Sequence, residues 1–335
     1  MKKKKLFLHL GYPKTGSTTL NEIIMPNIKG LKSFIPNANY KFLRQMDDKK
    51  YLDDNYKIKV LIENFLYRKK DDNDIVEGLK ILSNVNENKI FISSTGSMSA
   101  FFFKGLYTKR GNYLDANFIS KKINDVFGEF FDVSIILIIR RQWTWIPSAY
   151  AEWHRILDDK SFVEFSTKFK NKRQIFHKGI DYYNVLSSFD KYFQKKNIFV
   201  STQEALTLNS FAFYTKLLKF IGGEIDEKFI RNTKKRNNRS GQKYKKIDRH
   251  NLLLFFRPLK MKYFPNTRFN FIKKYPWLLD IMTYIKLPYV DISKTIVLSK
   301  NDIYLIKKIY NNSNKKLSEK YGLNLEKFGY FDFYK

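Results

Sequence analysis

Four short apolar runs recur along the chain, and longer stretches of helical character separate them. Each run is rich in Ile, Val and Phe: Lys5–Leu10, Lys89–Ser93, Val133–Ile139 and Asn197–Ser201. Continuous apolar runs of this length are typical of strands buried on both faces. Because these runs alternate with helices, the sequence predicts a three-layer α/β fold in which helices flank a central parallel sheet. Residues 57–62 fit either a strand or a helix.

Two later segments lack this regularity. Residues 251–290 mix aromatic and basic side chains with four prolines, which interrupt any long helix. Residues 234–246 are polar and strongly basic, which predicts a loop. At 335 residues we expect a single domain over 1–335, with 251–290 as an insertion or a segment on the substrate side.

The charge of the chain is strongly positive, with 63 Lys and Arg against 32 Asp and Glu, a formal +31. This charge favours anionic partners, among them nucleic acid, anionic lipid, acidic glycan and a phosphorylated cofactor. The chain is also rich in Lys, Asn, Ile, Phe and Tyr throughout, as an AT-rich genome would produce. The charge alone therefore does not indicate which function the protein has.

Hydropathy and cysteine content bear on compartment. The sequence contains no run of about 18 apolar residues, so it does not predict a membrane span. The apolar run Leu6–Leu10 is too short for a signal peptide. We therefore expect a cytoplasmic protein, with peripheral contact with an anionic membrane left open. The absence of cysteine excludes disulfides and thiolate metal ligands.

The first apolar run leads into a loop, Gly11–Thr19, that is followed by a predicted helix over Leu20–Met25. A strand, a glycine-containing turn and a hydroxyl-rich helix start form a phosphate cradle, because backbone N–H groups and the helix dipole point at an anion. The loop differs from a Walker A loop, since Ser17 occupies the lysine position and the lysine lies earlier, at Lys14. From there its ammonium can reach the oxygen that bridges a phosphate and the transferred group.

The third apolar run ends in two cations, Arg140 and Arg141. A P-loop NTPase usually has an aspartate at the end of such a strand, where it helps to hold Mg²⁺. Cations in its place predict a site that neutralises anionic charge without a metal.

Residues 12–19, Tyr-Pro-Lys-Thr-Gly-Ser-Thr-Thr, resemble the 5'-phosphosulfate-binding loop of the sulfotransferases that use 3'-phosphoadenosine-5'-phosphosulfate (PAPS), commonly Pro-Lys-Ser/Thr-Gly-Thr-Thr. In this family an arginine ends a later strand, and a serine eight residues on helps to hold the 3'-phosphate; Arg140 and Ser148 have that spacing. The resemblance, to bacterial members in particular, implies a P-loop-like fold and PAPS as cosubstrate. The cofactor-binding residues that it implies are Lys14, Thr15, Gly16, Ser17, Thr18, Thr19, Arg140 and Ser148.

Weaker similarities to the family follow in the same order along the chain. They lie in residues 197–206, 213–222 and 236–241, and in 318–325 with 328–330. Each carries little information by itself, and their order extends the resemblance over most of the chain.

The resemblance implies transfer of a sulfuryl group to an acceptor hydroxyl or amine, with Lys14 as the catalytic residue that stabilises the leaving oxygen. By analogy with bacterial members, the expected acceptor is a glycan or another cell-surface component. A hydroxyl acceptor needs a general base, and Thr95 stands where some bacterial members have glutamate.

The candidates for the base are Glu63, Glu152 and His154, and each also fits an ordinary helix surface. His9, inside the first strand, is expected to be a packed core histidine.

Two other classes of function stay open on the sequence. A divergent P-loop kinase or nucleotide hydrolase is disfavoured by the displaced lysine and by the missing aspartate at the strand end. A non-catalytic basic protein would bind nucleic acid or anionic membrane through residues 234–246 and 251–290. The chain has no helix-turn-helix, zinc-finger or RNA-recognition signature, so no specific nucleic acid partner is expected.

Overall fold

The computed structural model describes residues 3–35, 49–67, 72–93, 116–148, 179–233, 244–245, 295–296 and 298–331. A five-stranded parallel sheet forms the centre, in the order β2-β3-β1-β4-β5. Its strands are β1 (Lys4–His9), β2 (Leu31–Phe34), β3 (Lys89–Ser93), β4 (Phe131–Ile139) and β5 (Ile198–Thr202). All four apolar runs are strands of this sheet, which confirms the predicted α/β fold.

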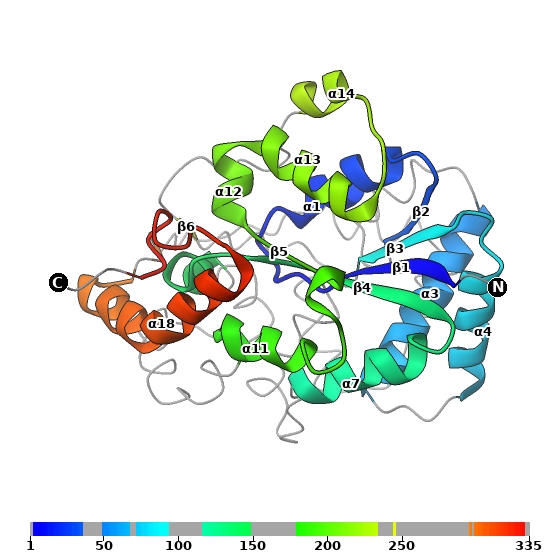
Figure 1. The fold of residues 1–335 in the computed structure, drawn as a ribbon, viewed down its shortest axis with the longest axis horizontal. Helices are drawn as coiled ribbons and strands as arrows, with labels where there is room; N and C mark the ends of the chain where they lie inside the picture. The colour runs from blue at the N-terminus through cyan, green and yellow to red at the C-terminus, as the bar shows by residue number, and fades with distance from the viewer. Residues whose placement is uncertain are drawn as a thin grey trace, which may run out of the picture.

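Helices cover both faces of the sheet, as Figure 1 shows. On one face lie α1 (Ser17–Thr19), the π-helix η1 (Leu20–Ile24), the 3₁₀ turn η2 (Met25–Asn27), α12 (Gln203–Leu208), α13 (Ser210–Ile221) and α14 (Glu227–Asn232). On the other lie α3 (Lys49–Tyr67), α4 (Asp72–Ser83), α7 (Ala116–Phe127), α11 (Tyr182–Phe189) and α18 (Lys300–Tyr321). The described part also contains the 3₁₀ turn η3 (Lys195–Asn197) and an antiparallel pair, β6 (Tyr244–Lys245) and β7 (Thr295–Ile296).

The strands are buried on both faces because their side chains alternate between two apolar layers. In β1, Leu6 and Leu8 pack with the layer of α3, α7 and α11, whereas Phe7 packs with the layer of α13. In β4, Ile135 and Ile136 divide in the same way. A continuous apolar run is thus what a central strand of a sheet covered on two sides requires.

The sheet order places the ends of β1 and β4 side by side. The chain leaves β1 toward β2 on one edge and leaves β4 toward β5 on the other edge. Loops that diverge from adjacent parallel strands leave a crevice at the carboxyl ends, which is where α/β sheets bind ligands. Here β4 continues from Ile136, the partner of His9, to Ile139. Arg140 therefore follows β4 close to the loop that follows β1.

Several local predictions differ from the structure. The ambiguous range 57–62 is part of helix α3, and the sequence pattern missed the four-residue edge strand β2. The helix predicted over Leu20–Met25 is instead a π-helix that passes into a 3₁₀ turn. The helix that follows β4 begins at Gln142, five residues before Pro147. The reason is that the carbonyl of Arg141 already accepts hydrogen bonds from the backbone N–H groups that follow it.

Some predictions fall on parts that the structure does not describe. Thr95, Glu152, His154 and most of 234–246 lie outside the described residues, as does all of 251–290. Glu63 lies in α3, but its side chain is outside the described set. A single domain over 1–335 therefore stays a prediction. None of the helices formed by the described residues is long and apolar enough to cross a membrane.

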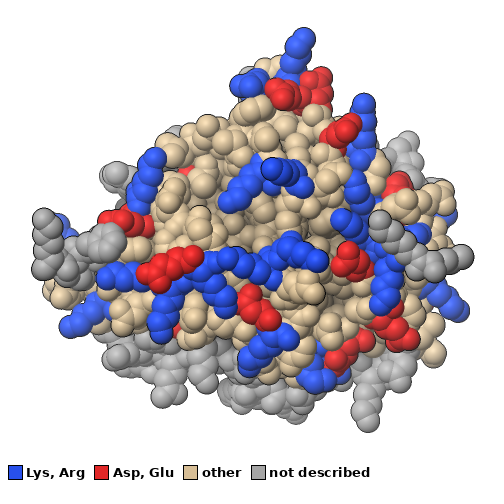
Figure 2. Space-filling model, in the orientation of Figure 1, with Lys and Arg blue, Asp and Glu red and all other residues tan. Residues whose placement is uncertain are grey.

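Figure 2 shows how the charges lie on one face of the molecule. Lys and Arg side chains form a band across the middle of this face and also spread over its other parts, with Asp and Glu between them. Because the positive charge of this face is spread so widely, charge by itself does not locate a binding site.

Candidate functional site

The loop after β1 turns through two left-handed residues. Lys14 has φ 66° and Gly16 has φ 91°, and α1 begins at Ser17. Turns of this kind direct successive backbone N–H groups toward one concave side, where an anion can bind. A left-handed conformation is unusual for lysine and costs about 1–2 kcal/mol. Lys14 therefore depends on its surroundings to hold it in place.

Buried contacts hold the loop in this shape. The Thr15 hydroxyl donates to the carbonyl of Tyr12 at 2.6 Å. The Tyr12 hydroxyl donates to the carbonyl of Gly179 at 2.7 Å, and its ring packs edge-on against Trp145. The Trp145 indole N–H in turn donates to the carbonyl of Pro13 at 2.8 Å. The loop is thus braced from the helix that follows β4.

Burial separates the loop residues into two groups. Thr15 and Thr19 are buried, whereas Lys14, Ser17 and Thr18 are half-buried and Gly16 is exposed. The latter residues form the outer surface of the loop. The Thr15 hydroxyl donates within the loop itself, so its hydrogen is not directed at an anion outside.

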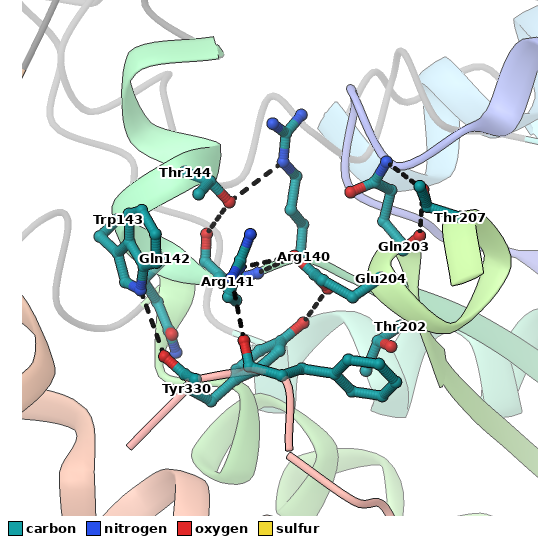
Figure 3. A network of polar contacts seen from close by, with 12 residues as sticks. Arg140, Arg141, Gln142, Trp143, Thr144, Thr202, Gln203, Glu204, Thr207 and Tyr330 are labelled. Carbon is teal, nitrogen blue, oxygen red and sulfur yellow. Dashed lines mark hydrogen bonds and ion pairs between the residues drawn. The ribbon is translucent and has the colours of Figure 1, made fainter. Parts of the chain in front are cut away.

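The second motif joins the first through Arg140. Its Nη1 donates to the carbonyl of Lys14 at 3.0 Å and to Oγ of Ser148 at 3.3 Å, and its Nε donates to Oγ1 of Thr144 at 3.2 Å. The carbonyl of Arg140 accepts from the hydroxyl of Tyr182 at 2.6 Å. In Figure 3 the Arg140 side chain points away from the buried network around its neighbours. The structure therefore brings together the lysine loop and the arginine–serine pair.

A buried carboxylate that the sequence did not single out lies behind this turn. Oε1 of Glu204 accepts from the backbone N–H of Arg141 at 3.2 Å and pairs with its Nε at 3.3 Å. Oε2 accepts from the hydroxyl of Tyr330 at 2.8 Å. Burial and the Glu204 carboxylate hold the pKa of Tyr330 well above its usual value, so this hydroxyl stays protonated as the donor. Glu204 and Tyr330 lie within stretches that are similar to the family, but nothing local in either stretch indicates that they meet.

His9 lies at the end of β1 and is fully buried, as expected for a core histidine. Its ring stacks on Phe91, and Nδ1 lies 3.1 Å from Oγ of Ser93. A Cβ atom at Gly11 would lie 2.5 Å from His9 Nε2, so only glycine fits between this ring and the loop. Burial lowers the pKa of His9 to about 4, so the ring is neutral near pH 7. His9 therefore packs against the loop at Gly11 as an uncharged core side chain.

The low pKa of His9 predicts a loss of stability in mild acid. A histidine of pKa 6.5 in the unfolded chain and about 4 in the folded chain takes up a proton only on unfolding between these values. Stability therefore falls as the pH drops from about 6.5 to about 4, by about 3 kcal/mol in total. Urea unfolding of the wild type and of His9→Gln at several pH values measures this difference. Parallel curves for the two proteins would contradict it.

Gly16→Ala is expected to destabilise the loop through both conformation and contact. A Cβ at position 16 would lie 2.6 Å from Cδ2 of Leu206, which is buried in α12. Gly30→Ala is a matched control, because Gly30 has φ 69° but nothing within 4 Å of such a Cβ. Both variants should lose about 1–2 kcal/mol from the left-handed conformation, and Gly16→Ala about 1 kcal/mol more from overpacking. Equal losses in urea unfolding would show that Leu206 does not restrict the loop.

Within the described ranges, no group of three or more His, Asp or Glu side chains is arranged to hold a metal ion.

The comparisons with known proteins find similarity to solved structures. No protein-family model matches the chain, and no curated protein sequence matches it.

Among solved structures, the chain is similar to a sulfotransferase from Alicyclobacillus acidocaldarius, at 13% identity and a TM-score of 0.42, over 70% of this chain and 85% of that chain. It is also similar to the sulfotransferase domain of the Synechococcus PCC 7002 olefin synthase, at 12% identity and a TM-score of 0.36, over 93% and 94%. For mouse sulfotransferase SULT7A1 complexed with PAP, the values are 12% and 0.36, over 69% and 63%. Each of these three structures is of a sulfotransferase or a sulfotransferase domain.

Proposed function

We propose that this protein transfers the sulfuryl group of PAPS to an acceptor hydroxyl or amine. The observation that carries the proposal is the contact of Arg140 with both the Lys14 carbonyl and the Ser148 hydroxyl. This contact joins two anion-binding elements, the loop after β1 and the turn after β4, into one site at the carboxyl ends of adjacent strands. PAPS carries two anionic groups at separate positions, the 5'-phosphosulfate and the 3'-phosphate, and so matches a site of two parts.

Each part of the site has a separate role in this proposal. Backbone N–H groups of residues 15–19 and the hydroxyls of Ser17 and Thr18 hold the 5'-phosphosulfate. Arg140 and Ser148 hold the 3'-phosphate, for which the planar arginine fork is suited because it can donate two hydrogen bonds to one phosphate. ATP lacks a 3'-phosphate, so this second part gives the selectivity for PAPS.

The reaction is an in-line displacement at sulfur. The acceptor oxygen or nitrogen forms a bond to sulfur while the bond between sulfur and the bridging phosphate oxygen breaks. The electron pair of that bond stays on the phosphate oxygen, and the acceptor loses its proton. The Lys14 ammonium stabilises the negative charge on the leaving oxygen, a type of contribution that acts most strongly in the transition state. Glu63, Glu152 and His154 are the proposed candidates for accepting the proton.

The test of this proposal is calorimetric titration with adenosine 3',5'-bisphosphate (PAP), the product that PAPS leaves behind. We expect PAP to bind without added Mg²⁺ and to bind more tightly than 5'-AMP or ATP, because only PAP carries the 3'-phosphate. Equal affinity for PAP and 5'-AMP would contradict the assignment of Arg140 and Ser148. A preference for ATP that depends on Mg²⁺ would favour a kinase or nucleotide hydrolase instead.

A further inference from the structure

The turn after β4 is held from behind by residues 328–330, near the far end of the described chain. The Arg141 Nη1 donates to the carbonyl of Phe328 at 3.1 Å, and the Trp143 indole N–H donates to the carbonyl of Gly329 at 3.3 Å. The Arg141 guanidinium also lies over the Trp143 ring, 4.6 Å from its centroid. Figure 3 shows these contacts at Arg141 and Trp143, which follow Arg140 in the chain. Arg141 is thus engaged inside the protein, unlike a side chain directed at a ligand.

Glu204 links Tyr330 to the peptide bond between Arg140 and Arg141. The N–H of that peptide donates to Glu204 at 3.2 Å, and its carbonyl oxygen accepts from Tyr182 at 2.6 Å. Both ends of the peptide unit are therefore fixed by side chains. Because this rigid peptide unit includes the Cα of Arg140, fixing it restricts the direction in which the Arg140 side chain leaves the backbone.

A second buried contact ties Tyr330 to the same turn. The Asn314 amide donates to the carbonyl of Tyr330 at 3.0 Å, and its oxygen accepts from the Gln142 amide at 3.0 Å. Tyr330, Asn314 and Gln142 are all buried. Buried polar groups that satisfy one another resist displacement, because breaking one contact leaves its partner without water. A shift of Tyr330 would therefore also shift the turn after β4.

We propose that Tyr330 and Glu204 are positioning residues that orient Arg140 for the 3'-phosphate of PAPS. This inference rests on the proposed function, since it assigns a role within the same site. It makes selectivity for the 3'-phosphate depend on a hydrogen bond between residues 126 positions apart in the sequence. Neither side chain needs to touch the nucleotide.

The test is Tyr330→Phe, which removes one hydroxyl and keeps the ring. We expect PAP to bind roughly fivefold to tenfold more weakly, in the lower range of coupling between sites, while 5'-AMP binding is unchanged. Tyr321→Phe is the matched control: its hydroxyl also donates to a carboxylate, Asp190, at 2.6 Å. That variant should bind both nucleotides like the wild type. Unchanged PAP binding by Tyr330→Phe, or equal losses for PAP and 5'-AMP, would overturn the inference.

Two further measurements separate the possible failures. In an Arg140→Ala background, Tyr330→Phe should not weaken PAP binding further, because its effect passes through Arg140. A further loss of the same size would overturn the inference. If Tyr330→Phe does not fold, Glu204→Gln replaces one acceptor oxygen by an amide and should show the same selective loss. The wild-type preference for PAP over 5'-AMP tests the proposed function on its own, before any variant is compared.

Discussion

Lys14→Met should lower the rate of sulfuryl transfer by about 100- to 1,000-fold, the usual effect of removing one group that stabilises a developing oxyanion. The substitution removes the ammonium and keeps a side chain of similar length. Lys14 is half-buried, and methionine has the same Cβ as lysine, so the left-handed backbone at this position is no more strained than before. The fold should therefore change little. Transfer rates with saturating PAPS, together with urea unfolding, measure both effects.

The control for this variant is Lys228→Met, at an exposed position in α14. It removes the same charge far from the loop along the chain and should turn over like the wild type. This control matters because the formal net charge is +31, and a general effect of charge must be separated from the role of one ammonium. Turnover of Lys14→Met at the wild-type rate would contradict the proposed mechanism.

Arg140→Ala should weaken the binding of PAP by roughly 10- to 150-fold, which corresponds to the loss of about 1.5–3 kcal/mol for a hydrogen bond to a charged group. The preference for PAP over 5'-AMP should disappear. A smaller loss for both nucleotides is also expected, because the variant removes the hydrogen bond to the Lys14 carbonyl. Calorimetric titration of both nucleotides measures the two effects separately.

Two other arginine variants sharpen this result. Arg140→Lys keeps the charge but loses the planar fork, so its affinity for PAP should lie between those of the wild type and Arg140→Ala. Arg231→Ala removes an arginine whose side chain is 59% exposed and should bind PAP like the wild type. If Arg140→Ala kept the wild-type preference for PAP over 5'-AMP, the 3'-phosphate would have to bind elsewhere.

The central strands could be predicted from the sequence because burial on both faces makes each of them a continuous apolar run. The edge strand β2 could not be predicted, because its four residues are too few to show a pattern and Lys32 lies among them. The order of the strands in the sheet could not be predicted either. Runs of Ile, Val and Phe that are alike in composition do not specify which strand pairs with which.

The residues of the site likewise include some that the sequence predicts and some that it does not. Lys14 belongs to a local loop, and Arg140 and Ser148 are separated by eight positions, so both motifs are legible within short windows. The contacts of Glu204 with Arg141 and Tyr330 join residues from three distant parts of the chain. No local pattern encodes such contacts, because they exist only once the sheet has brought β4, α12 and the segment after α18 together.

The left-handed backbone of Lys14 has a consequence for how this sequence can change. Glycine adopts φ 66° without strain, so a chain selected for stability alone would carry glycine at position 14. In the proposed mechanism the ammonium of Lys14 is required, and the left-handed backbone there costs about 1–2 kcal/mol in folding free energy. Position 14 is therefore one where selection for stability and selection for activity oppose each other. On the proposed mechanism, Lys14→Gly would relieve the backbone strain and would lower the rate of transfer.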